Sequence, residues 1–147
     1  MAFQNILVPT DFTEPSYRAL RLACQMARPI GAHVAILHVG VDAGSQSDIA
    51  MAGASGAVYA NLSARIEAEQ RATLERISTQ EIPEGVPSST HLRYGDPATC
   101  VLERLQTGDH DLVVMGTHGR KGLARVLLGS VAEKVLRDSP VPVLLTR

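Results

Sequence analysis

Short runs of apolar, often β-branched residues alternate with longer segments of helical period along the chain, and this alternation most constrains the fold. Each run has the length and composition of a strand, and the intervening segments place apolar residues three and four positions apart. We expect strands at 5–8, 33–39, 89–94, 111–115 and 141–145, and helices at about 14–28, 58–77, 97–107 and 130–137. The sequence therefore predicts one α/β domain, residues 1–147, with a doubly wound, five-stranded parallel sheet and helices on both faces.

Composition supports this class of fold and excludes several functions. Hydrophobic residues make up 45% of the chain, aromatic residues only 3%, and tryptophan is absent, so the core must consist of Leu, Val, Ile and Ala. No apolar run approaches the roughly 18 residues of a membrane span. The formal net charge of −1 removes the electrostatic argument for a nucleic-acid partner.

Cysteine content and the N-terminus together predict the compartment. Cys24 and Cys100 both fall in predicted helices among apolar neighbours, where buried thiols are more common than a disulfide. The N-terminus leads almost directly into a strand, without the basic region and cleavage pattern of a secretory signal. We therefore expect a cytoplasmic protein.

Individual residues are expected to set the element boundaries. Pro9 should end the first strand because proline has no N–H to donate. The Thr13 hydroxyl should cap the first helix, and Asp96 followed by Pro97 should begin the helix at 97–107. In the helix at 58–77 the inward face is expected to consist of Tyr59, Leu62, Ile66, Glu69, Thr73, Leu74 and Ile77.

His33 and His38 lie at the two ends of the second predicted strand. Residues five positions apart on a strand point to opposite faces, so these two side chains cannot chelate one metal ion. We interpret both as structural histidines with satisfied hydrogen bonds.

A glycine-rich segment follows the fourth predicted strand and leads to the last helix. The strand ends at Gly116, Gly119 follows, and a further glycine, Gly129, precedes Ser130. Ser130 with Glu133 is typical of a capping box, so a helix should start there. Backbone N–H groups that converge at a helix N-terminus can bind an anion, for which phosphate is the natural candidate. Alternatively, the glycines supply positive φ at a tight turn, and Ser130 only caps the helix.

This segment resembles the nucleotide-binding signature of the universal stress protein family, in its ATP-binding branch. Two residues separate Gly116 from Gly119, nine separate Gly119 from Gly129, and Ser130 follows. Residues 6–13 (ILVPTDFT) resemble the family's first strand and adenosine-side turn, and 139–145 (SPVPVLL) resemble its last strand. The resemblance implies an adenine nucleotide alpha hydrolase-like fold. Together with the rule that ligands bind where the winding of a parallel sheet reverses, it implies strand order 3-2-1-4-5, with the reversal between strands 1 and 4.

On this basis, residues of several segments are expected to bind the nucleotide. Asp11 should accept a hydrogen bond from the adenine amino group or a ribose hydroxyl, or else cap the first helix with Thr13. The resemblance also implies that Val39 contacts adenine through its backbone. His118 has two alternatives, contact with phosphate or an ordinary loop position. Arg120 and Lys121 are equally compatible with phosphate binding and with simple solvation. The predicted binding residues are Pro9, Thr10, Asp11, Val39, Met115, Gly116, His118, Gly119, Arg120, Gly129, Ser130 and Val131, of which Met115 could equally be ordinary core packing.

The chain should act by binding rather than by efficient catalysis. The sequence offers no paired carboxylates, no assignable nucleophile with a base and no metal-ligand cluster, so we assign no catalytic or metal-binding residue. We expect a regulatory module of stress response that binds ATP or AMP, with Mg²⁺ as a candidate accompanying ion. The alternatives are a slow ATPase that uses His118 or Asp11, and a dimeric scaffold that binds no nucleotide. Because the apolar strand at 141–145 should lie at a sheet edge, we expect it to pair in a homodimer, unless residues 40–56 cover it.

Overall fold

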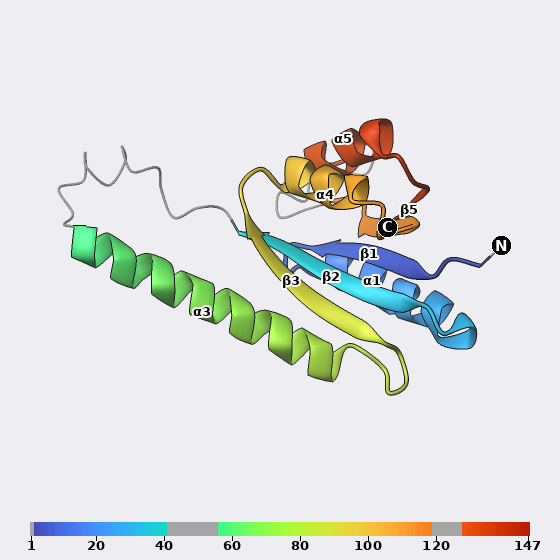
Figure 1. Ribbon diagram of the computed structural model, residues 1–147, viewed down its shortest axis with the longest axis horizontal. Helices are drawn as coiled ribbons and strands as arrows, with labels where there is room; N and C mark the ends of the chain where they lie inside the picture. The colour runs from blue at the N-terminus through green and yellow to red at the C-terminus, as the bar shows by residue number, and fades with distance from the viewer. Residues whose placement is uncertain (1, 41–55, 119–127) are drawn as a thin grey trace.

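The computed structural model describes residues 2–40, 56–118 and 128–147, and its centre is a five-stranded parallel sheet (Figure 1). The strands follow the order β3-β2-β1-β4-β5, so both the fold class and the predicted order are confirmed. Their bounds are β1 Asn5–Thr10, β2 His33–Gly40, β3 Ser88–Tyr94, β4 Leu112–Gly116 and β5 Val143–Thr146. The helical segments are α1 Glu14–Ala27, the short 3₁₀ turn η1 Arg28–Ile30, α3 Gly56–Gln80, α4 Pro97–Gln106 and α5 Ser130–Asp138.

The two faces of the sheet carry separate apolar cores. Side chains of a strand alternate between faces, and in β1 Ile6 and Val8 pack with α1 and α3, whereas Leu7 packs with α4 and α5. Figure 1 shows the corresponding layers, with α1 and α3 on one side of the sheet and α4 and α5 on the other. The winding thus reverses between β1 and β4, the position at which open α/β sheets bind ligands.

Both cysteines are free and buried, on opposite sides of the sheet. Cys24 belongs to α1, and burial raises the pKa of its thiol to about 11. Cys100 belongs to α4, and burial raises its thiol pKa as well. The predicted buried thiols are confirmed. Among the described helices, none is both long and apolar enough to cross a membrane.

The end of β1 differs from the prediction that Pro9 stops the strand. β1 continues through Pro9 to Thr10, which are paired with Leu37 and His38 of β2. On its other side, β1 pairs with β4 only through Ile6 and Leu7. Proline is tolerated because β1 has no ladder to maintain with β4 at that level. Because the pairing of β1 with β4 stops at Leu7, the carboxyl ends of these two strands are not paired with each other.

The predicted inward face of α3 is correct only near the C-terminal end of the helix. Leu74 and Ile77 are buried, whereas Leu62 is 49% exposed. In Figure 1 the first turns of α3 extend past the strands, so no sheet lies beneath them. The segment between β2 and α3, residues 41–55, lies outside the described residues, so the alternative that residues 40–56 cover the last strand stays open. That strand runs over Val143–Thr146 rather than 141–145.

Candidate functional site

The candidate site lies at the carboxyl ends of β1 and β4, where three segments come together. The Gly129 N–H donates to the Thr117 carbonyl over 2.8 Å, which places the start of α5 beside the residue that follows β4. Thr117 in turn donates its N–H to the Thr146 carbonyl at the end of β5, over 2.9 Å. The third segment is the β1–α1 turn, residues 10–13. The end of β4 and the start of α5 thus lie side by side, whereas the predicted binding roles of Gly116, Gly129, Ser130 and Val131 stay predictions.

Not all predicted residues can be placed. Gly119 and Arg120, together with Lys121, lie outside the described residues. Their roles stay predictions. The phosphate side of the candidate site is consequently represented by residues 116–118 and by the start of α5.

The β1–α1 turn is held by a dense set of polar contacts. The Thr10 hydroxyl oxygen accepts from the Phe12 N–H over 3.1 Å, and it lies 2.9 Å from the Ser16 hydroxyl. Ser16 also donates to the Thr13 carbonyl over 2.7 Å. Thr10 and Ser16 are both buried although they are polar, which is tolerable because their hydroxyls are hydrogen-bonded.

Asp11 uses one carboxylate oxygen within this turn. Its Oδ1 accepts from the Thr13 N–H over 3.1 Å and from the Thr13 hydroxyl. Thr13 is the N-cap residue of α1, but its side chain makes no capping bond, because the hydroxyl is directed to Asp11. The predicted Thr13 cap is therefore wrong. The alternative that Asp11 caps the helix together with Thr13 is not confirmed either, because the Asp11 Oδ1 bonds to Thr13 itself and Thr13 makes no side-chain capping bond. The role of Asp11 toward a nucleotide stays a prediction.

Phe12 adopts the left-handed conformation, with φ at 64°, and is the single non-glycine residue with positive φ in the described part of the chain. Such a conformation costs on the order of 1–3 kcal/mol for a non-glycine residue and concentrates at functional sites. The Phe12 ring stacks on the His38 ring with centroids 3.8 Å apart and planes at 22°. His38 is buried, and its Nδ1 lies 2.8 Å from the Thr10 carbonyl oxygen. The prediction that His38 is hydrogen-bonded within the structure is confirmed.

Gly116 is required by a close approach rather than by its backbone angle. A Cβ at this position would lie 3.1 Å from the Pro15 carbonyl oxygen in the first turn of α1. Gly116 is not among the described glycines with positive φ, so the alternative of a positive-φ turn is wrong for it. The glycine lets α1 begin directly against the end of β4. Met115, one residue earlier, is buried in the core with α4 and α5, as the packing alternative predicts.

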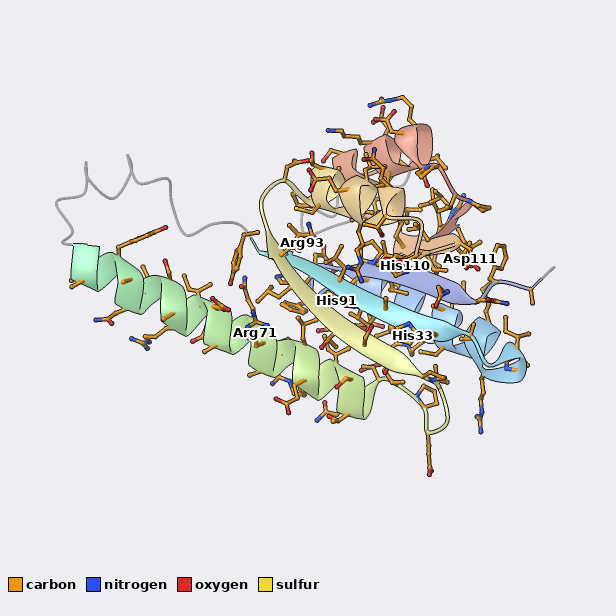
Figure 2. The ribbon with its side chains drawn as sticks, in the orientation of Figure 1. His33, Arg71, His91, Arg93, His110 and Asp111 are labelled. Carbon is orange, nitrogen blue, oxygen red and sulfur yellow. The ribbon has the colours of Figure 1, made fainter. Side chains whose placement is uncertain are left out.

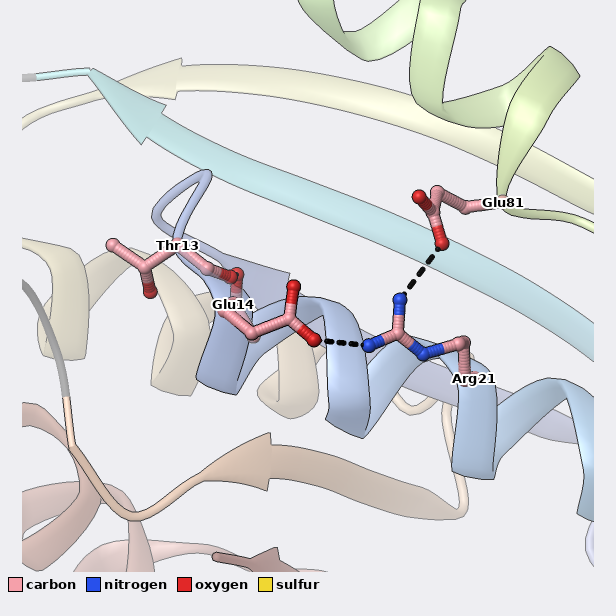
Figure 3. Close-up of polar contacts among 5 residues, drawn as sticks. Thr13, Glu14, Arg21 and Glu81 are labelled. Atoms are coloured by element: carbon pink, nitrogen blue, oxygen red, sulfur yellow. Dashed lines mark hydrogen bonds and ion pairs between the residues drawn. The ribbon is translucent and has the colours of Figure 1, made fainter.

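The first turn of α1 is also tied to α3. Arg21 forms ion pairs with Glu14 in α1 and, over 3.1 Å, with Glu81 just after α3 (Figure 3). These side chains are partly exposed, and exposed pairs contribute little free energy. Their consequence here is geometric, because they orient α1 relative to α3 near the β1–α1 turn.

The predicted capping box at α5 does not form. Gly129 is the N-cap, and Ser130 is the first helical residue, with no side-chain capping bond at this end. Glu133 instead lies 3.9 Å from Arg137, one turn further along. The helix begins at Ser130 as predicted, but Gly129, whose N–H bonds to the Thr117 carbonyl, takes the N-cap position that a capping box would give to Ser130. The Ser130 hydroxyl is exposed at the candidate site as a result.

His118 lies two residues after the end of β4 and is half-buried. Its Nδ1 is 2.8 Å from the Thr117 hydroxyl oxygen. Its Nε2 is buried and has no hydrogen-bond partner among residues 2–40, 56–118 and 128–147. A buried ring nitrogen normally has a partner. His118 thus presents an unsatisfied polar atom at the edge of the candidate site.

Other histidines lie away from this site. His33 begins β2, His110 precedes β4, and His91 lies within β3 (Figure 2). The Arg104 Nε donates to the His110 Nε2 over 3.1 Å, and burial is the main cause that lowers the pKa of both His91 and His110. Across the described residues, no group of three histidine, cysteine or acidic side chains could hold a metal ion.

Sequence reasoning missed the residues that shape the turn. Phe12, Pro15, Ser16 and His38 set its geometry, yet none was predicted to contribute to a site. A left-handed phenylalanine leaves no local sequence signal, and the contact of His38 with the turn requires knowledge of strand register. The Pro15 contact could be recognised only once α1 was known to lie against β4.

Comparison with known proteins agrees with this geometry. Residues 2–147 match the model of the Universal stress protein family. A universal stress protein of Methanocaldococcus jannaschii is 31% identical over 145 residues, which cover 99% of this chain and 82% of the relative. One from Bacillus subtilis is 30% identical over 151 residues, with 99% of both chains covered.

Solved structures agree as well. A universal stress protein in complex with cAMP superposes with a TM-score of 0.66 at 25% identity, covering 100% of this chain and 98% of that one. The chain therefore belongs to the universal stress protein family.

Proposed function

We propose that this protein binds an adenine nucleotide, ATP or AMP, between the carboxyl ends of β1 and β4. The observation that carries the proposal is the meeting of the Asp11 turn, the end of β4 and the uncapped start of α5 at the point where the winding reverses. A helix N-terminus attracts anions because its first N–H groups lack partners within the helix. This geometry favours a nucleotide whose phosphates lie at the start of α5 and whose nucleoside lies at Asp11.

The proposed roles divide between the two ends of the ligand. Pro9, Thr10, Asp11, Val39 and Met115 belong to the nucleoside side. A carboxylate at Asp11 suits hydroxyl or amino donors and would repel phosphate. The proposed phosphate side consists of Gly116, His118, Gly119, Arg120, Gly129, Ser130 and Val131.

Family membership and one liganded relative support the choice of ligand. The relative solved with cAMP is 25% identical to this chain, and its superposition covers 100% of this chain. That ligand contains adenine, ribose and one phosphate. The proposal extends the same chemistry to this chain, with Mg²⁺ as a candidate companion of the phosphates.

The proposed role is that of a cytoplasmic regulatory module in stress response, with ATP hydrolysis slow at most. We also propose a homodimer that pairs through the last strand, residues 141–145. β5 is at the sheet edge, and each of its residues is only partly buried in the single chain. An edge strand with apolar side chains favours pairing with a second copy. Sedimentation velocity should give a dimer, and a monomer at all concentrations would contradict this part.

The first test is direct. The purified protein is denatured and any released nucleotide is identified, and the nucleotide-free protein is then titrated with ATP and with AMP, with and without Mg²⁺. We expect micromolar affinity, about 8 kcal/mol. Gly129→Val should weaken binding strongly, whereas the same change at Gly56, where a Cβ meets nothing within 4 Å, should not. No released nucleotide and no heat would favour the scaffold alternative.

A further inference from the structure

His38 contacts both neighbours of Asp11. Its Nδ1 lies 2.8 Å from the carbonyl oxygen of Thr10, and its ring stacks on that of Phe12. His38 belongs to β2, 28 residues from Thr10. One buried ring on a separate strand therefore holds the two residues that flank the proposed nucleoside contact.

The hydrogen bond assigns the tautomer of this ring. A carbonyl oxygen can only accept, so the proton must lie on the His38 Nδ1. The bond is buried, because His38 is only 3% exposed and Thr10 only 5%. A buried acceptor that loses its donor is costly, so the Thr10 carbonyl depends on this nitrogen.

The stack bears on the strained residue of the turn. Phe12 has a φ of 64°, which a side chain of its size rarely adopts. Strained conformations persist only where several surrounding contacts hold the residue in place. Here those contacts are the Phe12 N–H bond to the Thr10 hydroxyl and the ring of His38. Without the ring, the turn can relax toward an ordinary conformation, and the Asp11 carboxylate would move with it.

We propose that His38 is a positioning residue for nucleotide binding, which holds Asp11 in its binding geometry through Thr10 and Phe12. The proposal rests on the function proposed above. Its competitor is a purely structural histidine, which fills the core between β2 and α1. The two differ in one respect, because loss of a structural residue lowers stability without changing the affinity of the molecules that remain folded.

The test compares nucleotide affinity with stability in matched variants. His38→Phe keeps an aromatic ring for the stack and removes the donor, whereas His38→Asn keeps an N–H near the position of Nδ1. The control is Ile36→Val, two residues away on the same face of β2 and fully buried. ATP affinity is measured by calorimetry, and the free energy of unfolding by urea denaturation.

We expect His38→Phe to bind ATP about fivefold to tenfold more weakly, the equivalent of one lost hydrogen bond. His38→Asn, which keeps a donor but loses the ring, should recover only part of the affinity that His38→Phe loses. Ile36→Val should lose stability with unchanged affinity. Phe12→Leu, which spares the buried histidine, should also weaken binding, and it decides the question if His38→Phe does not fold.

Long-range ¹H–¹⁵N spectra of the wild-type protein provide a readout that stability does not influence. They should show the proton on the His38 Nδ1 with and without nucleotide. An unprotonated Nδ1, or unchanged affinity in both His38→Phe and Phe12→Leu, would overturn the proposal while leaving nucleotide binding intact. If wild-type protein binds no nucleotide, the proposed function fails, and the positioning role fails with it.

Discussion

Helices α4 and α5 both begin at the carboxyl edge of the sheet, yet their first turns are satisfied differently. At α4, Asp96 accepts from the Thr99 N–H over 2.9 Å and from the Thr99 hydroxyl over 2.7 Å. At α5 no side chain of the described residues caps the helix, because its N-cap is Gly129, although the sequence there contains the signature of a capping box. At α4 the Asp96 carboxylate already supplies an acceptor for the first turn, whereas the first turn of α5 lacks such a side chain and lies beside the Gly116 turn. A missing cap at a helix start is thus more informative about ligands than the presence of a capping motif.

The largest effect is expected from Gly116→Ala, because α1 begins in contact with this glycine. The new Cβ would lie 3.1 Å from the Pro15 carbonyl, which belongs to backbone and cannot move alone. We expect a loss of about 1–3 kcal/mol in the free energy of unfolding, together with weaker nucleotide binding. Urea denaturation and calorimetry measure the two effects. Gly56→Ala is the control, and equal stability of the two variants would contradict the close-contact interpretation.

Asp96→Ala should have an intermediate effect that is confined to stability. Loss of an N-cap carboxylate costs about 1 kcal/mol. Nucleotide affinity should stay at the wild-type value because α4 begins at β3, outside the proposed site. A change in affinity as large as the change in stability would remove the distinction between the two helix starts.

Ser130→Ala should show the opposite pattern. Ser130 is exposed at the first helical position and caps nothing, so the free energy of unfolding without nucleotide should change by less than about 0.5 kcal/mol. Affinity for ATP should fall if its hydroxyl contacts phosphate, as proposed. A stability loss comparable with that of Asp96→Ala would show that Ser130 does cap α5 in solution.

The smallest effect is expected from pH, acting on the same α4 cap. Hydrogen bonds from the Thr99 hydroxyl and N–H lower the pKa of Asp96 from 3.8. The folded state therefore favours the carboxylate, and the resulting stability is present above pH 3.8 and is lost as pH falls through the folded-state pKa. The stability difference between wild type and Asp96→Ala should shrink below pH 4. Since the carboxylate is exposed, solvent screening keeps this effect small.

Sequence reasoning predicted most of the fold and the neighbourhood of the site, and its errors share a cause. Asp96 and Pro97 were correctly assigned because capping depends on residues within one turn. Pro9, Leu62 and Ser130 were assigned wrongly because tertiary context decides each of them. β1 is not paired with β4 at the level of Pro9, the first turns of α3 extend past the strands (Figure 1), and the bond to Thr117 makes Gly129 rather than Ser130 the N-cap. The left-handed Phe12 could not be predicted, since its conformation depends on contact with another strand.

The two buried thiols provide a means to follow local opening of this molecule. The thiolate is the reactive form of cysteine, so a thiol whose pKa is about 11, as at Cys24, is almost entirely protonated at neutral pH. Alkylation of Cys24 and Cys100 should therefore require exposure of the residue first. Because one thiol belongs to α1 and the other to α4, their labelling rates would separately report how often each layer detaches from the sheet. A nucleotide that joins the end of β4 to the first turn of α1 should slow the labelling of Cys24 more than that of Cys100.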